Sequence, residues 1–107
     1  MTLVGRAPTR EERLWMDRMV QVGCIVCRLY KKVYTPAEVH HLEGKVKPNA
    51  HLLTLPLCPC HHRLPGKAWV SRADGKKVFE AEFMPELDLL EITQALVEEM
   101  VLRGYLV

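Results

Sequence analysis

The sequence predicts a small α+β fold made of one domain, residues 1–107, and three observations lead to this prediction. Apolar residues recur at helical spacing towards both ends of the chain. Two short segments in the middle have the composition of strands, with loop-forming residues between them. The length suits a single core, and 49% apolar with 26% charged residues is the balance of a globular chain.

The first helix is expected to begin at a capping box. Thr9 and Glu12 have the spacing at which each side chain can bond the other residue's backbone N–H. Apolar residues continue at helical spacing to about Val22, and Gly23 ends the helix. Residues 24–27 are too few for a helix or a strand of their own and predict a turn that carries two thiols.

The middle of the chain predicts a hairpin followed by a short helix. Segments 35–42 and 51–57 have the pattern of short strands, and segment 44–49 between them has loop chemistry. Pro59 suits the first turn of a short helix that ends before Pro65. The remaining expected elements are a loop over 67–75, a short helix over 76–83 and a long helix over 85–103 capped by Gly104.

Charge divides the chain into a basic and an acidic part. Residues 1–77 carry 14 Lys or Arg against 6 Asp or Glu, whereas residues 78–107 carry 1 against 7. A basic surface attracts phosphate, so this division favours a nucleic-acid partner. An ordinary solvated surface is the other interpretation that charge alone allows.

No feature of the sequence predicts a membrane segment or an export signal. No apolar run approaches the roughly 20 residues that span a bilayer. Charged residues and a proline interrupt the first 13 residues before any signal-like apolar core. In a protein kept in a reducing compartment, four cysteines favour metal binding or catalysis over disulfides.

The cysteines predict a structural zinc site. Cys24 and Cys27 have the two-residue gap at which two thiolates bind one tetrahedral ion from a tight turn. His61 follows Cys58 with the same gap, so the predicted ligands are Cys24, Cys27, Cys58 and His61. Cys60 in place of His61 is the alternative. Such an ion would tie together distant parts of the chain and contribute to folding.

The adjacent histidines predict a second, catalytic site. His40 and His41 end the first expected strand, where neighbouring side chains point to opposite sides and do not readily bind one ion together. One can bind a divalent cation while the other takes a proton from water near neutral pH. His62 projects away from His61 and could return to the His40 side. Both roles suit phosphodiester hydrolysis. The cations expected to bind phosphate nearby are Lys45, Lys47, Arg63 and Lys67.

The chain resembles the HNH, or ββα-metal, endonucleases, and among them the phage recombination-enhancement (Ref-like) nucleases. The resemblance extends over about residues 23–83, through Gly-Cys-Ile-Val-Cys, Pro-Ala-Glu-Val-His-His, Leu-Pro-Leu-Cys-Pro-Cys-His-His-Arg and Lys-Lys-Val-Phe-Glu-Ala-Glu-Phe. It implies a core in which two strands and a helix hold one divalent metal beside a zinc knuckle. It also implies a metal-dependent DNA endonuclease, derived from a phage and active in the cytoplasm of a bacterial host.

The resemblance assigns roles to the histidines. It implies that His40 and His62 bind the catalytic metal, which would be Mg, Mn or Zn, and that His41 is the general base. His51 stands near the family's middle Asn, Asp or His, which positions the base. The implied substrate is DNA, either single-stranded or bound by a recombinase, and the sequence leaves the oligomeric state open.

One departure from the family pattern keeps a second function open. Related nucleases carry another metal-binding histidine downstream of the helix, and residues 63–107 contain no histidine. Asp74 or a water could take that place, or Ser71 could mark the lost ligand. The alternative function is a catalytically inactive, zinc-stabilised nucleic-acid-binding module, which would bind DNA in a salt-sensitive manner without turnover.

Overall fold

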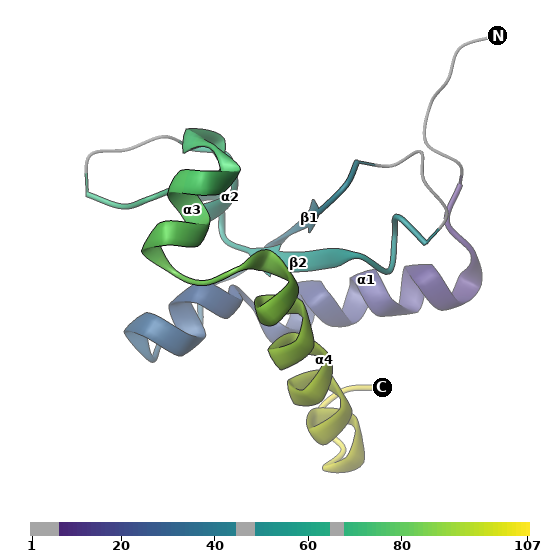
Figure 1. The fold of residues 1–107 in the computed structure, drawn as a ribbon. Helices are drawn as coiled ribbons and strands as arrows, with labels where there is room; N and C mark the ends of the chain where they lie inside the picture. The colour runs from purple at the N-terminus through teal and green to yellow at the C-terminus, as the bar shows by residue number, and fades with distance from the viewer. Residues whose placement is uncertain (1–6, 45–48, 65–67) are drawn as a thin grey trace, which may run out of the picture.

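The computed structural model describes residues 7–44, 49–64 and 68–107. Figure 1 shows α1 lying along a two-stranded hairpin, α2 and α3 gathered at one end of it, and α4 extending away from it. The arrangement confirms the predicted α+β class. The elements are α1 (Arg10–Val22), η1 (Cys27–Lys31), β1 (Glu38–His41), β2 (Thr54–Leu57), α2 (Pro59–His62), η2 (Arg72–Asp74), α3 (Lys76–Glu82) and α4 (Glu86–Leu102).

The first helix begins and ends as predicted. Thr9 Oγ1 accepts a hydrogen bond from the Glu12 backbone N–H at 3.2 Å, and Glu12 Oε1 accepts one from the Thr9 N–H at 2.8 Å. Gly23 ends α1 with a φ of 82°, where a Cβ would lie 2.7 Å from the Tyr34 ring and 2.9 Å from the Thr35 carbonyl oxygen. A larger residue would therefore be both strained and in collision at this point.

The segment after α1 is more regular than predicted. The Arg28 backbone N–H donates to the Cys24 carbonyl at 3.0 Å, and Cys27 begins the π-helical turn η1. The segment 24–27, predicted as a turn with two thiols, is thus a helical turn that continues into η1. Lys32, in the left-handed conformation with a φ of 58°, ends it.

The predicted hairpin is present and its strands are shorter than expected. β1 and β2 are antiparallel, with His40 opposite Leu55 and His41 opposite Thr54. The first strand starts at Glu38, two residues after Pro36, and the second contains Pro56 opposite Val39. Before β2, the Leu52 and Leu53 N–H groups bond back to the Asn49 carbonyl in a turn. Most of the expected loop, residues 45–48, lies outside the described residues.

The chain after the hairpin follows the predicted order. α2 starts with Pro59 in its first turn, and α3 and α4 occupy the two helical segments expected. The expected loop over 67–75 contains a short 3-10 turn, η2. Ser71 and Asp74 cap this turn: Asp74 Oδ2 accepts from the Ser71 N–H at 2.9 Å, and Ser71 Oγ accepts from the Ala73 N–H at 3.0 Å.

The core consists of two buried clusters that meet at Trp15 and Leu96. The larger one contains the cysteines at positions 24, 27 and 58 together with apolar residues of β2, α3 and the start of α4. The smaller one joins α1 to the end of α4 and the C-terminal Leu106. The thiols are thus part of the core, and the long C-terminal helix completes it.

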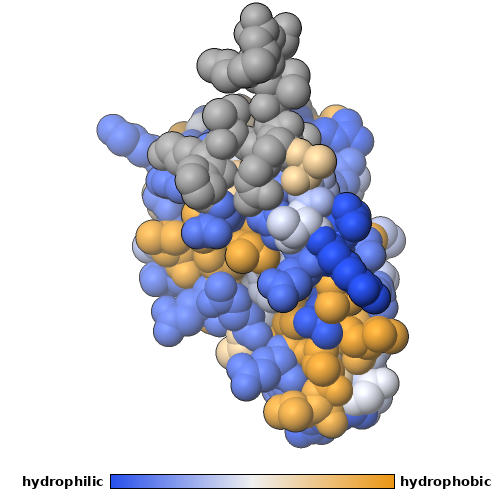
Figure 2. Space-filling model, turned by 90° about the vertical axis from the view of Figure 1, so that its right-hand side faces the viewer, coloured by the Kyte–Doolittle hydropathy of each residue, from blue (hydrophilic) through white to orange (hydrophobic). Residues whose placement is uncertain are grey.

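Hydrophobic side chains also remain on the surface around the end of α4. Figure 2 shows an orange area at the lower end of the molecule, where Figure 1 places this helix and the C-terminus. Leu102, Tyr105 and Val107 are exposed by 82%, 69% and 87%. Within the described parts of the chain, no helix has the length and apolar composition to cross a membrane.

Candidate zinc cluster and histidine site

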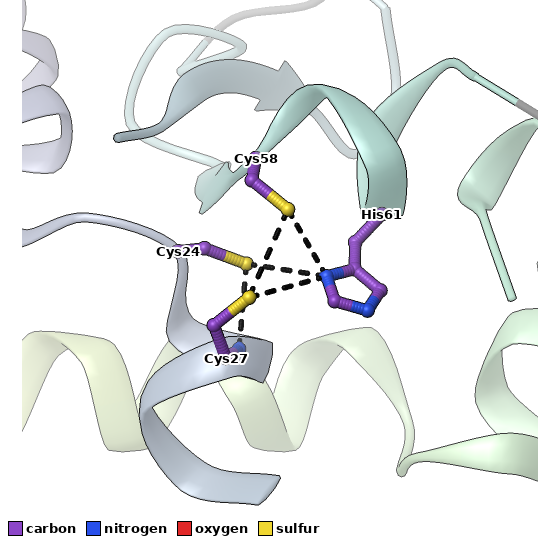
Figure 3. Close-up of side chains that lie close together, drawn as sticks. All are labelled: Cys24, Cys27, Cys58 and His61. Carbon is purple, nitrogen blue, oxygen red and sulfur yellow. Dashed lines mark hydrogen bonds between the residues drawn. The ribbon is translucent and has the colours of Figure 1, made fainter. Parts of the chain in front are cut away.

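Three thiols and one imidazole converge in the larger core cluster. Figure 3 shows the four side chains pointing toward one another, and their ligand atoms all lie within 4.8 Å of one another. His61 Nδ1 is 3.1 Å from the Cys58 sulfur, 3.5 Å from that of Cys27 and 3.6 Å from that of Cys24, and the sulfurs of Cys27 and Cys58 are 3.8 Å apart. Tetrahedral zinc with ordinary bond lengths requires about 3.8 Å between sulfurs and about 3.5 Å between sulfur and nitrogen. The cluster therefore fits a structural zinc ion.

Local backbone geometry brings these four side chains together. The Cys27 N–H donates to the Cys24 sulfur at 3.4 Å, which fixes the first pair. Cys58 precedes α2, and its carbonyl accepts the His61 N–H at 3.0 Å, so a single short helical turn presents the second pair. In each pair, the gap of two residues noted in the sequence places both side chains on one turn of the backbone.

Burial controls the protonation of the cluster. It raises the pKa of the Cys24 thiol to about 12 and also raises the pKa of Cys58. Burial, together with the charge of Lys31, lowers the pKa of His61 and keeps its imidazole neutral, as a metal ligand must be. A dication that binds the thiols of Cys24 and Cys58 therefore displaces their protons.

Cys60, the alternative fourth ligand, is not part of the cluster. It is only partly buried and packs against the edge of the core, whereas His61 is buried and supplies Nδ1. The structure therefore brings together the preferred set, with His61 in the fourth place.

This placement makes Cys60→Ser a mild substitution. We expect zinc content equal to that of the wild type and a loss of stability below about 1 kcal/mol, because only partly buried contacts change. Metal analysis of the purified variant and a thermal melt would check both. A variant that loses zinc would show that Cys60, not His61, completes the ligand set.

His40 and His62 face each other across β1 and α2. Their ring centroids are 5.2 Å apart. His40 is buried, and its Nε2 lies 2.7 Å from Glu86 Oε2. His62 is partly exposed, and its Nδ1 lies 2.9 Å from Glu38 Oε1. Each histidine thus has one ring nitrogen against a carboxylate, the arrangement that commonly orients metal-binding imidazoles through their outer nitrogen.

Two arginines hold these carboxylates. Arg72 Nε lies 3.1 Å from Glu86 Oε2, and Arg63 binds both oxygens of Glu38 at 2.9–3.0 Å. The hydrogen bonds from Arg63 and His62 lower the pKa of Glu38. Burial raises the pKa of Glu86, but its bond to His40 and the charges of His40 and Arg72 outweigh burial and lower it overall. Both carboxylates are therefore ionised acceptors at neutral pH.

His41 lies against His51. Its Nε2 is 3.0 Å from His51 Nδ1, and the two rings meet edge to face at 5.2 Å. The His51 carbonyl accepts a hydrogen bond from Thr54 Oγ1 at 3.3 Å, and that hydroxyl accepts one from the Trp15 indole N–H at 2.9 Å. A chain of hydrogen bonds from α1 thus supports the turn that carries His51.

His40 and His41 have different partners, as expected of neighbours in a strand. A metal ion can be held where three or more Cys, His, Asp or Glu side chains come close together. Within the described parts of the chain, one group meets this condition, and it consists of Cys24, Cys27, Cys58 and His61. Asp74, weighed as a further metal ligand, caps η2 instead.

Three of the four predicted phosphate-binding residues, Lys45, Lys47 and Lys67, lie outside the described residues. Arg63 is described, and its half-exposed side chain bonds to Glu38. Sequence reasoning missed both carboxylates. Glu38 could have been found, because it precedes His40 by two residues and so shares its side of the strand. Glu86 carried no comparable signal, since 46 residues separate it from His40.

Most of the chain matches a known protein family. A family described as recombination enhancement, RecA-dependent nuclease matches residues 8–98. The matched segment runs from the capping box of α1 to near the end of α4 and includes every cysteine and histidine described above.

Proposed function

Because the chain belongs to the recombination enhancement, RecA-dependent nuclease family, we propose that it is an HNH-type DNA endonuclease formed by one domain, residues 1–107. The observation that best supports this proposal is the pairing of the histidines. His40 lies against His62, and His41 separately lies against His51. This pairing divides the histidines into a metal-binding pair and a proton-transfer pair, on a hairpin followed by a short helix, the ββα order of the HNH nucleases.

His40 and His62 are the residues that would hold the catalytic divalent metal. Each has one ring nitrogen against a carboxylate, so the second ring nitrogen of each would be the metal-binding atom. Two imidazoles suit several divalent cations, and water and phosphate oxygens would complete the coordination. When bound, Mg, Mn or Zn would supply positive charge for the phosphate and the departing oxygen.

His41 would act as the general base. Its Nε2 lies 3.0 Å from His51 Nδ1, and an imidazole held in this way can accept a proton from the attacking water. His51 then fixes the ring orientation of His41. The hydrogen bonds of Thr54 and Trp15 hold this turn in place.

The basic part of the chain would bind the substrate. The excess of positive charge over residues 1–77 suits a DNA backbone, and a RecA-dependent family points to single-stranded or recombinase-bound DNA. We propose that Lys45, Lys47, Arg63 and Lys67 contact phosphate. We also propose that the protein derives from a phage and acts on DNA in the cytoplasm of a bacterial host.

Cleavage of defined DNA substrates tests the proposal. Labelled single-stranded DNA, double-stranded DNA and DNA coated with RecA should be incubated with zinc-loaded protein, with and without Mg or Mn. We expect cleavage of at least one substrate that requires the added cation. Salt-sensitive DNA binding without cleavage under every condition would instead favour the inactive nucleic-acid-binding module, which the lack of a histidine after His62 motivates.

A further inference from the structure

We infer that Glu86 is a positioning residue for His40: it accepts the Nε2–H of this histidine and thereby presents Nδ1 as the metal-binding atom. The inference rests on the proposed function, because it concerns the same metal site. It assigns a role to a residue of the long C-terminal helix, outside both the hairpin and α2.

The position of the Glu86 carboxylate is fixed by its surroundings. Glu86 is the first residue of α4 and is only 2% exposed. Its backbone N–H donates to Glu80 Oε2 at 2.6 Å, which ties the start of α4 to α3. Leu89 and Leu90 anchor the following turn in the larger core cluster. The carboxylate therefore meets His40 from a rigid support rather than from a mobile surface chain.

The chemistry of the three groups sets the direction of the hydrogen bond. Arg72 can only donate, and an ionised carboxylate can only accept, so Glu86 Oε2 receives hydrogens from both Arg72 Nε and His40 Nε2. A neutral His40 then carries its hydrogen on Nε2 and its lone pair on Nδ1. The 2.7 Å separation between Nε2 and Oε2 is that of a charge-assisted hydrogen bond.

The two oxygens of the Glu86 carboxylate have different surroundings, because His40 and Arg72 both bond to Oε2. Glu86 Oε1 is buried and has no hydrogen-bond partner within the described parts of the chain. Burial of a carboxylate oxygen without a partner is costly. The hydrogen bonds of this carboxylate to His40 and Arg72 are therefore concentrated on Oε2, and a carboxylate that accepts the Nε2–H of His40 makes its imidazole a stronger metal ligand.

The test is Mn²⁺ binding by zinc-loaded protein, followed by electron paramagnetic resonance, in Glu86→Gln. Glutamine keeps an acceptor oxygen and a similar shape but removes the charge. The matched control is Glu99→Gln on the same helix, whose exposed side chain pairs only with Arg103 in the described structure. We expect Mn²⁺ affinity about 10–100-fold weaker in Glu86→Gln and unchanged in Glu99→Gln, with full zinc content in both.

A measurement on the wild type covers the case in which Glu86→Gln fails to fold. Nitrogen-15 NMR of the zinc-loaded protein, at a pH where His40 is neutral, reports which ring nitrogen carries the hydrogen. We expect the Nε2–H tautomer. The Nδ1–H tautomer, or Mn²⁺ affinity unchanged in a folded Glu86→Gln, would overturn the inference.

These outcomes remain separate from the fate of the proposed function. If the wild type neither binds Mn²⁺ nor cleaves DNA, the proposed nuclease site fails, whereas the tautomer still decides whether Glu86 orients His40. If the wild type binds Mn²⁺ and cleaves DNA, but Glu86→Gln binds Mn²⁺ equally well, only the role of Glu86 is overturned.

Discussion

Replacement of Cys58 by serine is expected to unfold the domain under conditions in which the wild type is folded. Cys58 is buried in the cluster. Its sulfur lies 3.8 Å from the sulfur of Cys27 and 3.1 Å from Nδ1 of His61. Serine is nearly the same size but does not supply a thiolate. Structural zinc contributes about 10–16 kcal/mol in small metal-binding peptides, and whole domains are stable by only about 5–15 kcal/mol.

Cys60→Ser is the matched control for this experiment. It makes the same chemical change two residues further along, at a thiol outside the cluster. Metal analysis, circular dichroism and thermal melts of the two variants should therefore separate them: Cys58→Ser without zinc and largely unfolded, Cys60→Ser close to the wild type. A Cys58→Ser protein with wild-type zinc content and melting temperature would show that the cluster does not hold the structural ion.

The second large effect is expected for His41→Ala. Loss of a general base commonly lowers a rate by about 10²–10⁴-fold, and the proposed role gives His41 that function. The fold should tolerate the change, because His41 is only partly buried and lies outside both core clusters. Single-turnover cleavage of the best DNA substrate, with zinc content and melting temperature as controls, would measure the effect.

DNA affinity distinguishes the explanations of a slow His41→Ala variant. If His41 acts in proton transfer, the variant should bind DNA as tightly as the wild type and cleave it more slowly. A cleavage rate within about twofold of the wild type would rule out His41 as the base. Weaker DNA binding in proportion to the lost activity would instead make His41 a substrate-binding residue.

Local sequence patterns predicted the parts of this protein that depend on short-range geometry. The capping box of α1, the glycine at its end and the proline that opens α2 each act within a few residues, and each is found as expected. The four residues predicted to bind zinc also come together as expected, since a gap of two residues places two potential ligand atoms on one turn. The family match over residues 8–98 agrees with the resemblance to recombination-enhancement nucleases.

The features that sequence reasoning missed depend on contacts between distant elements. Glu86 reaches His40 because α4 packs on β2, and nothing in the neighbouring sequence of a long amphipathic helix distinguishes this glutamate from the others. Trp15 is an apolar position in α1 by its pattern, and only the fold shows that its indole bonds to Thr54. The late start of β2 has a local cause, since the turn at Asn49 takes up the residues before it.

We propose that the chain holds a structural zinc and a separate, exchangeable catalytic cation. The most direct test is Mn²⁺ binding to zinc-loaded wild type and His40→Ala, with the zinc content of each measured in the same samples. We predict one Mn²⁺ per wild-type chain, lost in His40→Ala, and one zinc in both. Equal Mn²⁺ binding by the two proteins, or none by the wild type, would contradict the claim.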